Sequence, residues 1–150
     1  MKNTLIAATI ALATMTGAAM ADMMITKTSP HSVSDTMDRL SAAVEGAGAK
    51  IFARVDHAKG AASVDMELRA TQMLMFGNPK LGTPAMLQAQ SMGLDLPLRV
   101  VAYEGEDGSV TVSYYDPASL AKLHGADPEA KVFKMMTGAL DKLTNKAIEE

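Results

Sequence analysis

The residues with the clearest capacity for chemistry lie in one short stretch, residues 76–84, which reads Phe-Gly-Asn-Pro-Lys-Leu-Gly-Thr-Pro. An apolar run leads into a glycine-containing loop, and Thr83 followed by Pro84 is typical of the start of a helix. The free N–H groups and the positive dipole end of a helix bind small anions, and Lys80 would add a positive charge there. The pattern therefore predicts an anion or carboxylate site made by Asn78, Lys80, Gly82 and Thr83. A loop whose glycines and prolines only satisfy backbone geometry is the alternative.

Polar residues on apolar segments extend this candidate site. Arg99 interrupts the apolar run 96–102, where a charge needs a partner or water. It predicts either an ion pair with Glu67 or a contact that recognises a carboxylate. We place Arg99 beside Lys80 as a second anion contact, with His57 or Tyr114 as groups that orient the ligand. The expected apolar wall consists of Phe76, Met86 and Met92.

Three other classes of function stay open. His57 and His124, together with methionine thioethers, are candidate ligands for copper or haem b, since thioethers suit copper(I). A small hydrolase or isomerase would need Asp56, His57 and Tyr114 to converge. A structural or interaction dimer without a pocket is the last alternative. No known catalytic motif is present, so no catalytic residue is assigned and the cofactor is unknown.

Composition excludes several classes of function. The 150 residues carry a net charge of −3, so there is no basic field for binding a nucleic-acid backbone. The chain has no cysteine, which excludes disulfides, thiolate metal sites and a cysteine nucleophile. Methionine is abundant, with 13 residues. In the absence of a dense Met-x-x-Met series, methionine is more simply a filler of cores and apolar pockets.

Residues 1–21 have the pattern of a secretory signal peptide. Lys2 precedes an apolar run from Leu5 to Ala13, and Ala19-Met20-Ala21 has the small-x-small form of a cleavage site. The run is shorter than the ~20 residues that span a bilayer. We therefore expect cleavage before Asp22, a periplasmic protein without a membrane anchor, and a mature domain of residues 22–150. Loss of the single lysine makes the mature charge −4.

The spacing of apolar residues predicts the elements that position these groups. Ser32 is the expected cap of a helix whose buried stripe is Val33, Met37, Leu40 and Val44. Asp116-Pro117 and Asp127-Pro128 are expected to begin two more helices, and Val132, Met136, Leu140, Leu143 and Ala147 form the stripe of the last one. Strands are expected at residues 23–28, 50–56, 64–69, 73–76, 96–104 and 109–115.

Consecutive strands without crossover helices predict an α+β fold in two layers. The expected sheet is twisted and mainly antiparallel, with helices packed on one face in the order strand, helix, several strands, helix. Residues 105–108 carry a hairpin signal between two of the strands. No repeat or linker divides the mature chain, so a single domain is expected.

Residues 32–125 resemble the family called domain of unknown function 302. The resemblance is carried by the segments 32–44, 52–57, 67–69, 76–84, 94–99 and 114–117, and residues 76–80 are its most specific part. It implies an α+β fold similar to the TATA-binding-protein-like architecture, and it implies a homodimer. The family brings no established reaction or ligand, and shared architecture alone gives no reason to expect DNA binding.

Overall fold

The computed structural model describes residues 23–150, and the expected signal peptide lies outside the described residues. The strands form one antiparallel sheet in the order β1-β5-β4-β3-β2. The elements are β1 (Met24–Ser29), α2 (Val33–Gly46), β2 (Lys50–Asp56), α3 (His57–Ala62), β3 (Thr71–Gly77), α4 (Pro79–Gln88), the 3₁₀ helix η1 (Gln90–Leu94), β4 (Leu98–Glu104), β5 (Val110–Tyr115), α5 (Pro117–Leu123) and α6 (Lys131–Ile148). The predicted α+β class is therefore confirmed.

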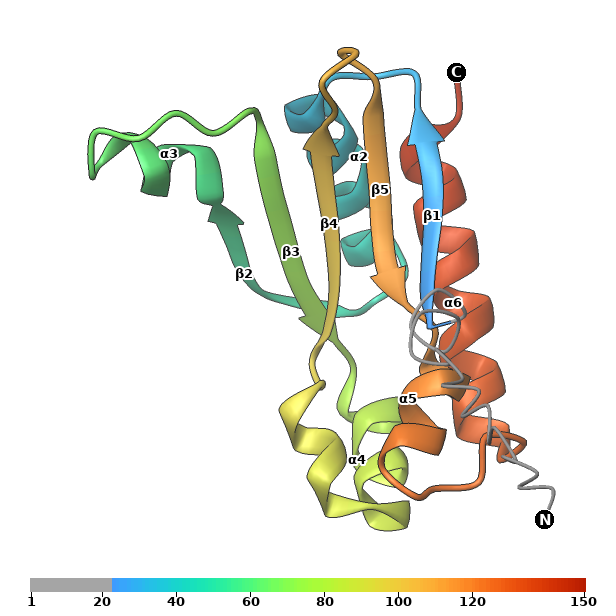
Figure 1. Cartoon of the computed structure of the whole chain (residues 1–150). Helices are drawn as coiled ribbons and strands as arrows, with labels where there is room; N and C mark the ends of the chain where they lie inside the picture. Colours follow the sequence, from blue (N-terminus) through green and yellow to red (C-terminus); the bar gives the residue numbers. More distant parts are fainter. Residues whose placement is uncertain (1–22) are drawn as a thin grey trace, which may run out of the picture.

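The two long helices, α2 and α6, pack side by side against one face of the sheet, behind it in Figure 1. The shorter helices α4, η1 and α5 gather at one end of the sheet, and α3 projects from the edge formed by β2. In the part of the chain that the structure describes, the other face of the sheet carries no helix (Figure 1). Among residues 23–150, no helix is both long enough and apolar enough to cross a membrane.

The long helices form where the periodicity predicts them. Ser32 caps α2, because its side-chain oxygen accepts a hydrogen bond from the N–H of Asp35. The predicted stripe of α2 is buried, as are four of the five residues predicted for α6. Phe133 is buried in place of the predicted Val132, which is only half-buried.

Apolar side chains form two clusters rather than one. The larger cluster lies between the sheet and the helices α2 and α6, and the smaller one joins α4, η1, α5 and the first turns of α6. Leu98, at the start of β4, packs against both. A pocket lies between the two clusters.

Lys27 connects the edge strand β1 to α6. Its ammonium group donates to the side-chain oxygens of Asp141, Thr144 and Asn145 at 2.7, 2.9 and 2.6 Å. The lysine side chain is only 15% exposed, so these charge-assisted bonds satisfy a largely buried cation. They fix β1 against the last turns of the helix.

The expected strand at 64–69 does not form. Asp56 instead caps α3 directly after β2, and its carboxylate accepts the N–H of Lys59 at 3.0 Å. The following segment projects with α3, and Val64, Met66 and Leu68 are 63%, 66% and 49% exposed. β2 is an edge strand that pairs with β3, and the alternating segment does not pair with its open side because the segment projects away from this edge with α3. The expected pair of Arg99 with Glu67 is also absent, because Arg99 binds Asp95.

Two of the three helix starts that were predicted from a residue followed by proline are wrong. Thr83-Pro84 lies inside α4, which begins one turn earlier because Asn78-Pro79 supplies the cap and the first-turn proline. Asp127-Pro128 forms a turn, in which Asp127 accepts the N–H of Glu129, and α6 starts only at Lys131. Asp116-Pro117 begins α5 as expected, with the Asp116 side chain accepting the N–H of Ser119.

Replacing Lys27 by alanine should lower the free energy of unfolding by about 1–3 kcal/mol, because a hydrogen-bonded, largely buried charged group is lost. Urea denaturation of the described domain measures this change. Lys142→Ala is the matched control, because Lys142 is an exposed residue of α6, the helix that Lys27 contacts. It should change stability by less than about 0.5 kcal/mol. Equal effects of the two substitutions would contradict the role given to Lys27.

Candidate functional site

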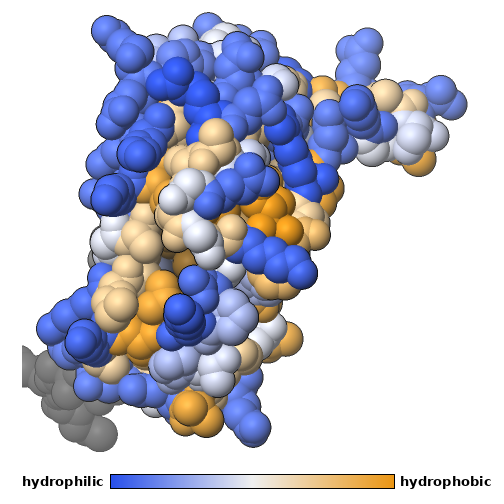
Figure 2. Space-filling model, turned by 180° about the vertical axis from the view of Figure 1, so that it is seen from behind, coloured by the Kyte–Doolittle hydropathy of each residue, from blue (hydrophilic) through white to orange (hydrophobic). Residues whose placement is uncertain are grey.

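A pocket of about 360 Å³ lies between the two apolar clusters, beside Leu98, which packs against both. It is enclosed by the connection between α2 and β2, the ends of β2 and β3, helix α4, the start of β4 and the middle of α6. Figure 2 shows the molecule from behind, with hydrophobic side chains gathered in the middle of this face. The lining residues are Ala47, Ala49, Phe52, Phe76, Gly77, Asn78, Pro79, Leu81, Gly82, Thr83, Met86, Leu96, Pro97, Leu98, Met136, Ala139, Leu140 and Leu143.

The lining is almost entirely apolar. Phe76, Met136 and Leu140 are each at most 3% exposed and also belong to the clusters, so the deep wall of the pocket is continuous with the protein core. Among the lining residues, only Asn78 and Thr83 have polar side chains. Such a surface favours an apolar ligand, since a buried polar group of the ligand would find few partners there.

Gly77 ends β3 at the edge of the pocket. A Cβ atom at this position would lie 3.4 Å from the Cβ of Pro97 and 3.9 Å from the ring of Phe52. These are ordinary van der Waals distances, so the space beside Gly77 would admit a methyl group. Pro97 and Phe52 are thus the side chains that face Gly77 at this edge.

Asn78 organises the first turn of α4. Its side-chain oxygen accepts the N–H of Lys80 at 2.9 Å, and its carbonyl accepts the N–H groups of Leu81 and Gly82 at 2.9 Å each. Pro79 has no N–H to offer. The first-turn amides that the sequence predicts as anion ligands are thus already bonded to Asn78. These bonds argue against an anion site at this turn.

The structure brings only part of the predicted site together. Asn78, Gly82 and Thr83 line the pocket, and so do Phe76 and Met86 of the predicted wall. Lys80 is exposed between two lining residues, on the outer side of the first turn. Met92 is fully buried in the smaller cluster and does not line the pocket.

Three other predicted residues lie elsewhere. Arg99 is exposed, on the face of the sheet that carries no helix, and its guanidinium bonds Asp95 at 2.6 Å. Tyr114 is buried on the opposite face, with the ammonium of Lys27 5.8 Å from the centre of its ring. His57 is exposed at the start of the projecting α3. These groups therefore do not form one site with the 78–83 turn.

The acid–base arrangement needed for the enzyme hypothesis is not formed either. Asp56 lies on β2 and Tyr114 on β5, and β3 and β4 separate these strands. Strands lie about 4.8 Å apart, so three steps place the two strands roughly 14 Å from each other. His124 is distant from His57 in the fold, and it contacts Asp95 and Ser91. Among residues 23–150, no three His, Cys, Asp or Glu side chains gather as metal ligands.

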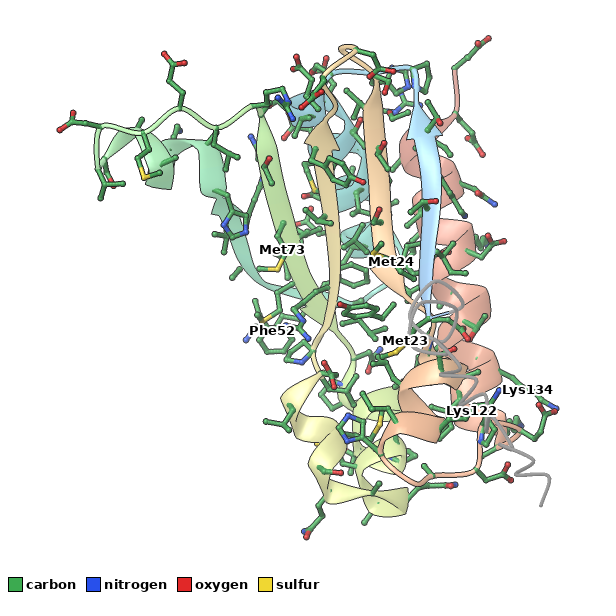
Figure 3. All side chains as sticks on the ribbon, viewed as in Figure 1. Met23, Met24, Phe52, Met73, Lys122 and Lys134 are labelled. Atoms are coloured by element: carbon green, nitrogen blue, oxygen red, sulfur yellow. The ribbon has the colours of Figure 1, made fainter. Side chains whose placement is uncertain are left out.

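A shifted pKa does not distinguish this pocket from the rest of the protein. Hydrogen bonds from the side chain and backbone of Ser109 hold the pKa of Asp107 below its ordinary value, but this turn lies at the far end of β4. Four positive side chains directly adjoin a lining residue in the sequence: Lys50, Lys80, Arg99 and Lys142. The ammonium of Lys50 lies 5.3 Å from the centre of the Phe52 ring, and this ring lines the pocket. Phe52 is labelled in Figure 3, at the end of the sheet closest to α4.

Sequence reasoning missed most of the lining. Phe52 and Ala139 gave no signal, because an aromatic residue on a strand and a small residue on a helix are ordinary. Met136, Leu140 and Leu143 were predicted as core residues of the last helix, which they are, but periodicity does not show that a stripe faces a gap. Leu96 and Pro97 were predicted as part of a strand that actually starts at Leu98.

The chain belongs to the family described as domain of unknown function DUF302, whose sequence profile matches residues 25–143. A crystal structure of an uncharacterized conserved DUF302 protein from Bacillus stearothermophilus has the same fold. Its TM-score is 0.74 at 15% sequence identity, and the match covers 83% of this chain and 98% of that one. At this identity the likeness concerns the fold alone.

Curated relatives carry a different description. The chain is 38% identical over 117 residues to proteins named fluoride-specific ion channel FluC 1 from Brucella suis and Brucella abortus. The match covers 77% of this chain but only 46% and 43% of those proteins. The chain thus spans less than half the length of these relatives.

Replacing Asn78 by alanine should lower the free energy of unfolding by about 0.5–2 kcal/mol, because the N–H of Lys80 loses its acceptor. Asn78→Asp keeps an acceptor oxygen at this position and should retain most of the stability. Thermal or urea denaturation measures both variants. If alanine and aspartate had the same effect, the side-chain cap would not be what holds this turn.

Proposed function

We propose that this protein binds a small molecule with an elongated apolar body and one anionic end, such as a medium-chain fatty acid. The apolar lining of the 360 Å³ pocket is the observation that carries this proposal. Ligand pockets commonly start at about 300 Å³, so the cavity is large enough for a small ligand. The pocket also adjoins the 78–83 turn, where the sequence predicts a ligand.

Burial of hydrocarbon supplies the affinity in this proposal. Each square ångström of apolar surface removed from water contributes about 25 cal/mol, before the cost of ordering the ligand. A hydrocarbon chain leaves no unpaired polar group against Phe76, Met136 or Leu140. Sugars and nucleotides would lose hydrogen bonds to water there without replacement, so they are disfavoured as the buried part of the ligand.

The anionic end is assigned by the rim of the pocket. Phe52, Pro79 and Thr83 are exposed lining residues, so they mark the side from which solvent reaches the cavity. Lys80 directly follows Pro79 in the chain, the ammonium of Lys50 lies 5.3 Å from the centre of the Phe52 ring, and both lysines are exposed. A carboxylate that stays in water at the rim would be attracted by both ammonium groups, and it needs none of the helix amides that Asn78 occupies.

The export and assembly of the protein are part of the same proposal. Residues 1–21 support export to the periplasm, where the mature chain would begin at Asp22. The homodimer implied by the family resemblance stays a prediction, and the face of the sheet without helices would be available for it. Copper or haem b binding stays a weaker hypothesis, because His57 and His124 lie apart.

Binding of laurate tests the proposal, with the fluorescent probe N-phenyl-1-naphthylamine as the reporter that laurate displaces. Ala139→Phe should weaken both probe and laurate at least tenfold, since the phenyl group fills the space that Ala139 lines. Ala42→Phe, on the exposed side of α2, is the matched control and should bind like the unmodified protein. Absence of binding, or equal binding by the two variants, would contradict the assigned pocket.

The charge at the rim is tested separately. Lys80→Ala should weaken laurate binding about 1.4- to 5-fold, the range expected for one exposed ionic contact of 0.2–1 kcal/mol. Dodecanol has the same chain length and no charge, so its affinity should not change. Calorimetry of both ligands with both proteins measures the difference. A similar loss for dodecanol would show that Lys80 acts through packing or stability and not through its charge.

A further inference from the structure

Four side chains form a continuous hydrogen-bonded chain at the end of the sheet where α4, η1 and α5 gather. The hydroxyl of Ser91 lies 2.9 Å from Nδ1 of His124, and Nε2 of this histidine lies 2.8 Å from Oδ2 of Asp95. The other carboxylate oxygen of Asp95 accepts a hydrogen bond from Arg99 at 2.6 Å. Ser91 belongs to η1, Arg99 to β4, and His124 follows α5 directly.

These contacts determine which ring nitrogen of His124 holds the proton. An ionised carboxylate only accepts hydrogen bonds, so Nε2 must carry a hydrogen toward Asp95. In the neutral imidazole, Nδ1 then presents its lone pair to the hydroxyl of Ser91. Arg99 keeps a positive charge on the far side of the carboxylate. The arrangement is that of a hydroxyl nucleophile, a base and an orienting carboxylate.

The middle of this chain is shielded and both of its ends are exposed, since the side chain of Arg99 at the other end is 40% exposed. The side chain of His124 is 8% exposed and that of Asp95 is 17% exposed, whereas Ser91 is exposed to solvent. A base shielded in this way is held in one orientation, while its hydroxyl partner is open to an incoming molecule. A purely structural connection between η1 and α5 would not need the serine end to be open.

Exposed leucines are also present at this end of the sheet. Leu87, Leu94 and Leu123 are 83%, 80% and 63% exposed, and they belong to α4, η1 and α5, the helices gathered at this end. Leu94 and Leu123 directly precede Asp95 and His124 in the chain. These three exposed leucines favour contact with a hydrocarbon group over contact with a polar one.

We propose that Ser91 is the nucleophile of an acyl-transfer site that accepts an apolar carboxylic ester. The Ser91 oxygen attacks the ester carbonyl while His124 takes its proton at Nδ1. The bond between the carbonyl carbon and the alcohol oxygen breaks, and the alcohol leaves with that proton. Water then attacks the acyl-serine while His124 takes its proton at Nδ1. The bond between the carbonyl carbon and the Ser91 oxygen breaks, His124 returns the proton to that oxygen, and the acid is released. Asp95 is a positioning residue in this scheme.

Two measurements test the site with the protein as it is. A fluorophosphonate probe should phosphonylate Ser91, as located by peptide mass spectrometry, and p-nitrophenyl butyrate should be hydrolysed. Ser91→Ala should lower the hydrolysis rate at least a hundredfold, within the range for losing a nucleophile and its proton transfer. Ser63→Ala is the matched control, since Ser63 is exposed and donates to the carbonyl of Gly60 instead of a histidine. It should leave the rate unchanged.

The absence of cysteine from the chain provides a second readout that does not depend on choosing the right ester. A thiol placed at Ser91 should lose its proton to His124, so Ser91→Cys should react with iodoacetamide at least tenfold faster than Ser63→Cys. Adding Asp95→Asn should reduce this advantage, while the melting temperature reports whether the fold is intact. Failure to modify Ser91 with the probe, or equal alkylation of the two cysteines, overturns the proposal.

Discussion

The packing of α2 and α6 on one face of the sheet is the interaction on which the other features depend. Both helices bury an apolar stripe against the central strands, but α2 ends at Gly46, before it reaches the end of the sheet near α4. The helices at that end form a separate cluster around Phe133 and Met136. The pocket lies between these two cores and takes its lining from both, with Leu98 in contact with each.

This origin explains why the pocket is apolar. Its deep wall consists of the same residues that would otherwise be core, such as Phe76 and Leu140. The polar groups lie outside this wall. Lys50 and Lys80 are close to the rim, and the hydrogen-bonded side chains of Ser91, His124, Asp95 and Arg99 lie among the short helices. The fold thus separates a surface suited to hydrocarbon from a surface suited to proton transfer.

Sequence patterns among neighbouring residues predict the helices and strands well, but they predict poorly which residues meet at a site. The Ser32 cap, the stripe from Val33 to Val44 and the turn between β4 and β5 each depend on residues near in sequence, so pattern alone finds them. The segment 64–69 alternates like a strand but does not form one, because alternation does not encode pairing and α3 leads this segment away from the edge strand β2. The contact of Asp95 with His124 joins residues 29 positions apart on different elements, and no local pattern encodes it.

The abundant methionines allow the most direct test of the central claim, that the gap between the two cores holds an apolar ligand. Methyl NMR of the protein labelled at its methionine methyl groups can follow a titration with laurate. Our account predicts that the signals of Met86 and Met136 shift, while those of Met24 and Met73, on the open face of the sheet, do not. Shifts confined to Met24 and Met73, or no shifts at all, would contradict it.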